Sequence, residues 1–163
     1  MQEQEKDNGA TQRARRFAEK MRVVVAAVIE REDRRLLIGQ RRRHDTSALK
    51  WEFPGGKVEE GETPEVALAR ELREELGVTL GKRVEIARVT HTYAETAEPL
   101  EIRFYVAEID GENLVARAFE RIAWVLPKEL AEYDFLKANL RLVANLATGR
   151  IKPREILDSA GNG

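Results

Sequence analysis

The chain has 163 residues, which is the length of a single domain. Charged residues make up 35% of it, yet 28 Lys and Arg against 29 Asp and Glu leave a formal net charge of -1. This balance argues against a simple polyanion binder, and a 42% hydrophobic share excludes wholesale disorder. The absence of cysteine excludes disulfides, thiolate metal sites and thiol nucleophiles.

The ends of the chain differ from its middle. We predict a flexible N-terminal extension over residues 1–20, with a short helix near residues 13–20, one domain over residues 21–150, and a loose tail over residues 151–163. The first twenty residues are too acidic for a signal peptide. No stretch approaches the ~20 apolar residues of a membrane helix. We therefore expect a cytoplasmic protein without a membrane partner.

The first part of the domain contains two predicted strands. Residues 23–29 form a continuous apolar run, as in a strand buried on both faces, and residues 36–40 form a second strand after a charged turn. A polar loop over residues 41–50 then leads to Trp51-Glu52-Phe53-Pro54-Gly55-Gly56. The Pro-Gly-Gly sequence predicts a turn.

A helix with clear boundaries follows. Thr63 is a suitable N-cap, Pro64 suits the first helical position, and Gly77 suits the C-terminal end. We expect its buried face to consist of Leu68, Ala69, Leu72 and Leu76.

The second half of the chain returns to strands and then ends in a helix. We predict strands over residues 84–94, 100–106 and 122–126, with a bulge near Ala87. We predict the last helix over residues 134–148, with a buried stripe of Leu136, Leu140, Val143 and Ala147. Strands mixed with well-separated helices indicate a layered α/β domain.

Three glutamates lie on one face of the first predicted helix. At ~100° per residue, Glu71, Glu74 and Glu75 fall within about 100° of one another. Beside a glycine-rich turn with free carbonyls, they would form the hard-oxygen ligand set that Mg²⁺ prefers. On the helix alone, a solvated face paired with Arg70 and Arg73 is the favoured interpretation. The surrounding spacing reverses that preference.

Residues 56–78 match the Nudix box at every fixed position: Gly, five residues, Glu, seven residues, Arg-Glu, an aliphatic residue, one residue, Glu-Glu, one residue, Gly and an aliphatic residue. The preceding Trp51-Glu-Phe-Pro-Gly-Gly-Lys57 is similar to the approach in MutT-type nucleoside triphosphate pyrophosphohydrolases. A looser resemblance extends over about residues 22–147. The resemblance implies a Nudix α/β/α sandwich with a mixed β-sheet between helices. It also implies hydrolysis of nucleoside triphosphates to monophosphate and pyrophosphate.

The resemblance also implies roles for individual residues. Metal ligands would be the Gly55 carbonyl with Glu71, Glu74 and Glu75, and the ion would be Mg²⁺, with Mn²⁺ as an alternative. Arg70 would hold the glutamates by ion pairing, and Glu62 would orient the loop or a helix glutamate. One helix glutamate would accept the proton of the attacking water, and the sequence does not distinguish which one.

Four further residues are candidates for binding the substrate. Asn139 resembles the asparagine that reads the purine edge in MutT-type enzymes, and its amide offers both a donor and acceptors. Arg41 would contact the base or phosphates, Lys57 would contact phosphates, and Phe53 would stack on the base. The alternatives are a surface asparagine, solvated cations and a core aromatic residue.

One position departs from the family pattern. Relatives often carry a further metal-binding carboxylate where this chain has Ala118, and Glu120 or a water would have to compensate. This leaves the number of bound metal ions open, and the reaction class unaffected.

The favoured function is a Mg²⁺-dependent pyrophosphohydrolase of nucleoside triphosphates, possible substrates being oxidised purine nucleotides such as 8-oxo-dGTP. The enzymatic alternatives are CTP, dinucleoside polyphosphates and ADP-ribose as substrates. A binding or regulatory Nudix-fold protein is a non-enzymatic alternative, and RNA-end processing is disfavoured by the balanced charge. The expected partner is a small nucleotide, bound by a monomer or a homodimer.

Overall fold

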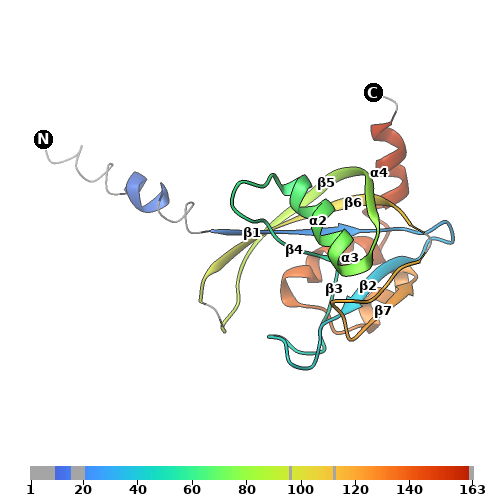
Figure 1. Cartoon of the computed structure of the whole chain (residues 1–163), viewed down its shortest axis with the longest axis horizontal. Coiled ribbons are helices and arrows are strands. Elements are labelled where there is room, and N and C mark those ends of the chain that lie inside the picture. Colours follow the sequence, from blue (N-terminus) through green and yellow to red (C-terminus); the bar gives the residue numbers. More distant parts are fainter. Residues whose placement is uncertain (1–9, 16–20, 96, 112, 162–163) are drawn as a thin grey trace, which may run out of the picture.

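The computed structural model describes residues 10–15, 21–95, 97–111 and 113–161 (Figure 1). Residues 10–15 are helical and exposed, and the rest of the helix expected over residues 13–20 lies outside the described residues. None of the helices in these ranges is long and apolar enough to span a membrane.

Seven strands form two sheets. The first sheet has the order β4-β1-β6-β5, and the second has the order β3-β2-β7. Only the β1–β6 pair is parallel among the named pairs, so the first sheet is mixed, as expected. The strands are β1 (Arg22–Val28), β2 (Leu36–Gln40), β3 (Trp51–Glu52), β4 (Gly55–Lys57), β5 (Thr79–Thr92), β6 (Pro99–Asp110) and β7 (Arg121–Val125).

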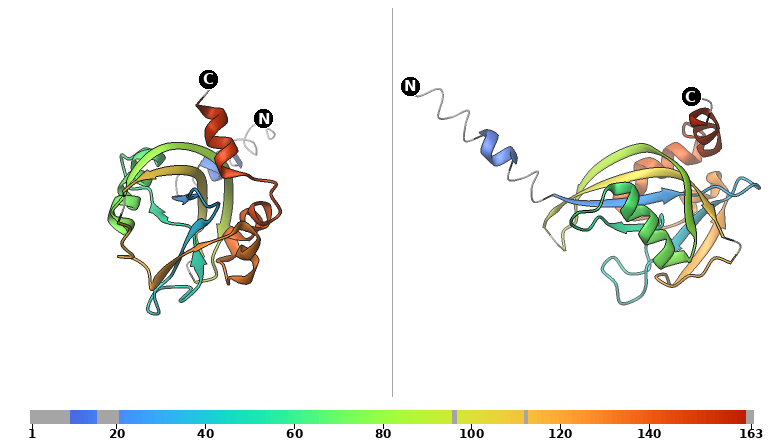
Figure 2. Two further views of the ribbon diagram at one scale, coloured as in Figure 1. Left: turned by 90° about the vertical axis from the view of Figure 1, so that its right-hand side faces the viewer. Right: turned by 45° about the horizontal axis from the view of Figure 1, so that its top comes forward.

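Helices cover both faces of the first sheet, as in the predicted α/β/α sandwich. Helix α2 lies on one face, and α3 with the two short 3-10 helices lies on the other (Figures 1 and 2). The helical elements are α2 (Pro64–Leu76), η1 (Pro127–Glu132), η2 (Lys137–Asn139), α3 (Leu140–Ala147) and α4 (Pro153–Ala160).

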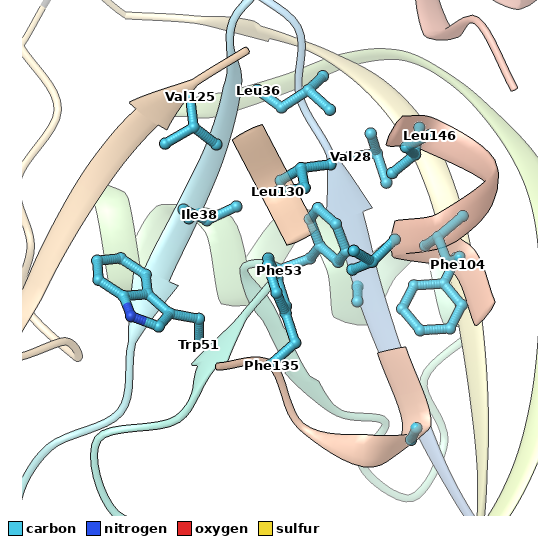
Figure 3. Packing of buried hydrophobic residues seen from close by; sticks show 14 of the residues in the cluster. Val28, Leu36, Ile38, Trp51, Phe53, Phe104, Val125, Leu130, Phe135 and Leu146 are labelled. Atoms are coloured by element: carbon cyan, nitrogen blue, oxygen red, sulfur yellow. The ribbon is translucent and has the colours of Figure 1, made fainter. Parts of the chain in front are cut away.

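Strand β1 is apolar from Val23 to Val28, and its residues from Val25 on are buried on both faces of the sheet. Val25 and Ala27 face α2, whereas Ala26 and Val28 face the α3 side. Alternate residues of this run therefore pack into two separate hydrophobic cores. The core on the α3 side is aromatic, with Trp51, Phe53, Phe104 and Phe135 from three segments (Figure 3).

The helix boundaries expected for α2 are confirmed. The Thr63 side chain accepts a hydrogen bond from the Val66 N–H at 3.2 Å, Pro64 begins the helix, and Gly77 ends it with φ 69°. The buried residues are those expected, except that Ala67 takes the place of Ala69. The bulge expected near Ala87 is also present, as a register shift between Glu85 and Ala87.

The turn expected at Pro54-Gly55-Gly56 is not what the structure forms. Only Pro54 bends, and Gly55–Lys57 is strand β4, paired with β1. A side chain at Gly55 would overlap the Val25 carbonyl, so glycine is required here for close strand approach and not for a turn.

The expected helix over residues 134–148 begins later than predicted. The Asp134 carbonyl accepts from Trp51 N–H at 2.9 Å, and Leu136 N–H donates to the Trp51 carbonyl at 3.0 Å, so this segment pairs with β3. Helix α3 begins only at Leu140, which changes its phase. Leu140 is therefore 50% exposed, and the buried residues of α3 are Leu142, Val143 and Leu146.

The tail expected to be loose from residue 151 is largely helical. Residues Pro153–Ala160 form α4, which packs beside β5 and β6 with Pro153 and Leu157 buried. Its Arg154 also lies 3.6 Å from Glu30, whose side chain is almost fully buried. Pro153 and Leu157 are only two buried residues, which is too few to form a recognisable apolar pattern in the sequence.

Candidate active site

A cleft of about 440 Å³ opens on the α3 side of the first sheet. Its floor is the face of β4, β1 and β6 that carries Lys57, Val24 and Ile102 in one row of paired strands. Five of the residues predicted from the sequence line it directly, together with Glu75 of helix α2: Arg41, Phe53, Gly55, Lys57 and Asn139. The fold therefore brings together residues from four separate segments of the chain.

The carboxylates of α2 reach the cleft through the glycines of β4. Glu75 Oε2 accepts a hydrogen bond from the Gly55 N–H at 3.1 Å. The Glu71 carboxylate occupies the space beside Gly56 that any side chain there would fill. Two glycines without side chains thus allow two glutamates of the helix to approach the strand backbone.

Arg70 connects the glutamates to one another. Its guanidinium donates to Glu62 at 2.9 Å, to Glu71 at 2.8 Å, to Glu74 at 3.3 Å and to the Lys57 carbonyl at 2.9 Å. Glu62 also accepts from the Glu59 N–H at 3.0 Å. These contacts agree with the holding role expected for Arg70 and tie the loop before α2 to the helix.

The carboxyl groups around Arg70 differ in the direction of their pKa shifts. The Arg70 hydrogen bond lowers the pKa of Glu62, whereas burial raises the pKa of Glu71 despite the same arginine. Burial, and then the charges of Glu71 and Glu52, raise the pKa of Glu75 to about 9. The cleft therefore holds a buried acid whose charge lacks a compensating cation among the described side chains.

The three helix glutamates do not converge on one point. Among the described residues, no three Asp, Glu, His or Cys side chains are close enough together to hold a metal ion. Arg70 binds both Glu71 and Glu74, and Glu74 lies at the outer edge with a side chain that is 61% exposed. The expected three-glutamate ligand set is thus not assembled in this structure. Of the three glutamates, Glu75 lines the cleft, whereas Glu71 and Glu74 pair with Arg70.

The cleft also contains Asn139. It is the one buried polar residue within the described ranges, with 4% exposure, and it lines the cleft at the end of η2. Its side chain makes no capping hydrogen bond to α3. The residue is therefore buried against the cleft without serving as a side-chain cap of the helix that follows it.

Phe53 differs from its expected role as a stacking residue. It is 3% exposed and lies between Phe135, at a ring distance of 5.5 Å, and Phe104, at 6.3 Å. It lines the cleft with part of its ring while belonging to the core (Figure 3). Phe104 is fully buried and cannot stack on a base.

The wall at Ala118 shows the departure noted in the sequence. Ala118 lines the cleft, whereas Glu120 pairs with Arg43 at 3.1 Å. The loop that carries Ala118 is fixed to the end of α2, since Arg117 N–H donates to the Glu75 carbonyl at 3.1 Å. Within the described residues, Glu120 is therefore engaged elsewhere and does not replace the missing carboxylate.

The sequence analysis missed one half-buried residue of the cleft. Glu52 lines it and lies 3.2 Å from Arg41, and burial raises its pKa despite that partner. The sequence shows Glu52 beside Phe53, shortly before Gly55, but it does not show whether the Glu52 side chain faces the cleft or solvent. Tyr93 also lines the cleft and packs edge-on against His91 at a ring distance of 4.4 Å.

Comparisons with known proteins agree with this site. The NUDIX domain model matches residues 20–146. Over 132 residues the chain is 38% identical to the CTP pyrophosphohydrolase of Escherichia coli K12, covering 76% of this chain and 90% of the relative. Over 125 residues it is 38% identical to a putative 8-oxo-dGTP diphosphatase 2 of Mycobacterium tuberculosis, covering 77% and 87%.

A solved structure shows the same architecture. The chain superimposes with a TM-score of 0.68 and 32% identity on a structure from work on MutT of Aliivibrio salmonicida and Vibrio cholerae, covering 80% of this chain and 99% of that one. Residues 20–146, which the NUDIX domain model matches, include both sheets and α2 with its glutamates. The protein described here belongs to the NUDIX family.

Proposed function

We propose that this protein is a nucleotide pyrophosphohydrolase that cleaves a nucleoside triphosphate to a monophosphate and pyrophosphate. The observation that carries this proposal is the single cleft that joins two kinds of group. Asn139, a buried amide, lines this cleft together with Glu75 and Lys57. The amide suits a base, and the carboxylate with the lysine suits a metal-bound polyphosphate.

The NUDIX family generally uses a divalent metal ion, and we propose Mg²⁺ here, with Mn²⁺ as a substitute. The ligands would be Glu71, Glu74, Glu75 and the Gly55 carbonyl. The donor set supports this, because these are hard oxygen groups and the pKa of Glu75 is raised by burial and by neighbouring carboxylates. When bound, the ion neutralises phosphate oxygens and lowers the pKa of the attacking water.

The residues of the chain then have separate tasks. Arg70 and Glu62 hold Glu71 at the strand, Lys57 balances phosphate charge, and a helix glutamate accepts the proton of the attacking water. The exposed Glu74 side chain reaches its partners by rotation about its own bonds. All the box glutamates are present, which supports an enzyme over a regulatory protein of the same fold.

The base is the less constrained part of the proposal. A purine such as 8-oxoguanine in 8-oxo-dGTP offers a donor and acceptor edge for the Asn139 amide, and two relatives are named for 8-oxo-dGTP. A second candidate is CTP, since a relative is named for it and the buried Glu52 carboxylate can accept from the cytosine amino group.

A pyrophosphate-release panel tests the proposed function. It compares normal and oxidised nucleoside triphosphates, ADP-ribose and dinucleoside polyphosphates, each with Mg²⁺ and with EDTA. We expect a triphosphate to be the best substrate, in a Mg²⁺-dependent reaction. Undiminished release by Glu75→Gln and by Glu74→Gln would contradict the metal role of these residues, and preference for ADP-ribose would contradict the substrate class.

A further inference from the structure

Arg41 is held on two sides inside the cleft. On one side, its Nη1 donates to both oxygens of Glu52, at 3.2 and 3.4 Å. On the other, its Nε donates to the Thr46 carbonyl at 2.7 Å, and its Nη2 donates to the Thr46 hydroxyl at 3.2 Å. The guanidinium is thus engaged at all three nitrogens by groups from a strand and from a loop.

The loop that supplies Thr46 closes on Arg41 itself. Arg41 N–H donates to the Lys50 carbonyl at 2.9 Å, and Leu49 N–H donates to the Arg41 carbonyl at 3.1 Å. Ser47 and Leu49 adopt the left-handed backbone conformation, with φ of 53° and 61°. Residues other than glycine rarely adopt it. A loop held in this conformation at two non-glycine residues has its shape imposed by its contacts.

This loop also forms part of the cleft. Asp45, Thr46 and Ser47 line it together with Arg41 and Glu52. An arginine side chain loses much rotamer freedom when a ligand fixes it, and that entropy reduces binding. An arginine that is already fixed before the ligand arrives loses less.

We propose that Thr46 and Glu52 are positioning residues that fix Arg41 for nucleoside binding. This inference rests on the proposed function and extends it. The two residues hold the guanidinium plane at one orientation, so that its remaining N–H groups meet the base or sugar of only some nucleotides. The pair thereby sets nucleotide selectivity at the part of the cleft that Arg41 lines.

The cleanest test replaces the Thr46 hydroxyl and keeps the loop backbone. Thr46→Val removes one hydrogen bond to Arg41, and Thr46→Ser keeps it. Glu52→Gln removes the charge on the other side. Thr148→Val is the matched control, because its hydroxyl bonds the Ala144 carbonyl at 2.8 Å away from the cleft.

Two readouts separate positioning from a general structural effect. The first is kcat and KM for the best triphosphate of the panel and for the next best. The second is the dissociation constant of dGMP and dCMP in EDTA, where no metal bridges ligand and glutamates. We expect Thr46→Val to raise KM and the tighter monophosphate constant by about three- to tenfold. We expect kcat to stay within about twofold, because a contact made equally in ground and transition states affects KM alone.

Thr46→Ser should restore the wild-type values, and Thr148→Val should not change them. Glu52→Gln should reduce the preference for the best triphosphate over the next one. An unchanged KM and monophosphate affinity in Thr46→Val would overturn the positioning role, as would an equal effect of Thr148→Val.

Failure of the proposed function looks different. The wild-type protein would release no pyrophosphate from any nucleoside triphosphate, and the monophosphate affinities would still show whether Thr46 acts on a nucleoside site. Absence of wild-type binding to either monophosphate would overturn the nucleoside assignment itself.

Discussion

The Glu71 carboxylate lies against Gly56, in the space that a side chain on that glycine would occupy. This contact joins the helix that carries the acidic residues to the strand that lines the cleft. It depends on the absence of a single carbon atom, and it gives the most direct test of the site geometry.

Gly56→Ala should displace the Glu71 carboxylate and lower activity. Gly56 has ordinary backbone angles, so an alanine there adds the clash and no backbone strain. A displacement of about 1 Å can cost about a hundredfold in rate, and we expect a loss of that order in kcat for pyrophosphate release. Gly81→Ala is the control, because its new carbon would make ordinary contacts with Glu108. A fully active Gly56→Ala protein would show that Glu71 need not occupy this space.

Arg70→Gln should weaken both the fold and the reaction. The substitution leaves Glu62 and Glu71 without their cationic partner, and both carboxylates are only 15% exposed. We expect the free energy of unfolding to fall by about 1–2 kcal/mol, measured by urea denaturation in EDTA. In the control Arg88→Gln, the exposed pair with Glu85 is lost, and a much smaller change is expected. Equal losses in the two variants would mean that the Arg70 contacts carry no special weight.

Glu75→Gln should stabilise the metal-free protein at alkaline pH. The pKa of Glu75 is raised from 4.5 to about 9 in the folded state. Between these values the unfolded chain has lost the proton that the folded protein keeps, so this group makes stability fall as pH rises. Urea denaturation in EDTA should therefore show the variant to be more stable than the wild type by at least about 1 kcal/mol at pH 8, with a much smaller difference at pH 5.

The metal gives the matching control for this pH experiment. Mg²⁺ should stabilise the wild type at pH 8 and should stabilise Glu75→Gln less, because one carboxylate ligand is gone. A wild-type advantage at pH 8 in EDTA would contradict the raised pKa.

Asn139→Ala should reduce discrimination between bases while leaving the metal requirement intact. The amide is buried and lines the cleft, and it is not among the proposed metal ligands, so its loss affects base contacts first. We expect the ratio of kcat/KM between purine and pyrimidine triphosphates to change by about tenfold, as for a lost hydrogen bond in a buried site. Asn145→Ala, in helix α3, should leave the ratio unchanged. An unaltered ratio in both variants would remove Asn139 from base recognition.

The sequence by itself determined the parts of the molecule whose signals are local. Thr63, Pro64 and Gly77 specify the ends of α2 through capping chemistry that involves only neighbouring residues. The continuous apolar run of β1 specified burial on both faces. The spacing of the glutamates on α2 and the adjacent Arg70 form a local motif, and this motif indicated the family.

Tertiary structure alone decided which residues complete the cleft. Glu52 and Thr46 both contact Arg41 across a loop. The pairing of Trp51 with residues 134–136 delays the start of α3 until Leu140. The glycines of β4 are extended and not turned because β1 and α2 approach from opposite sides. Such outcomes depend on which segments meet in space, and hydrogen bonds between distant segments leave no periodic pattern in the sequence.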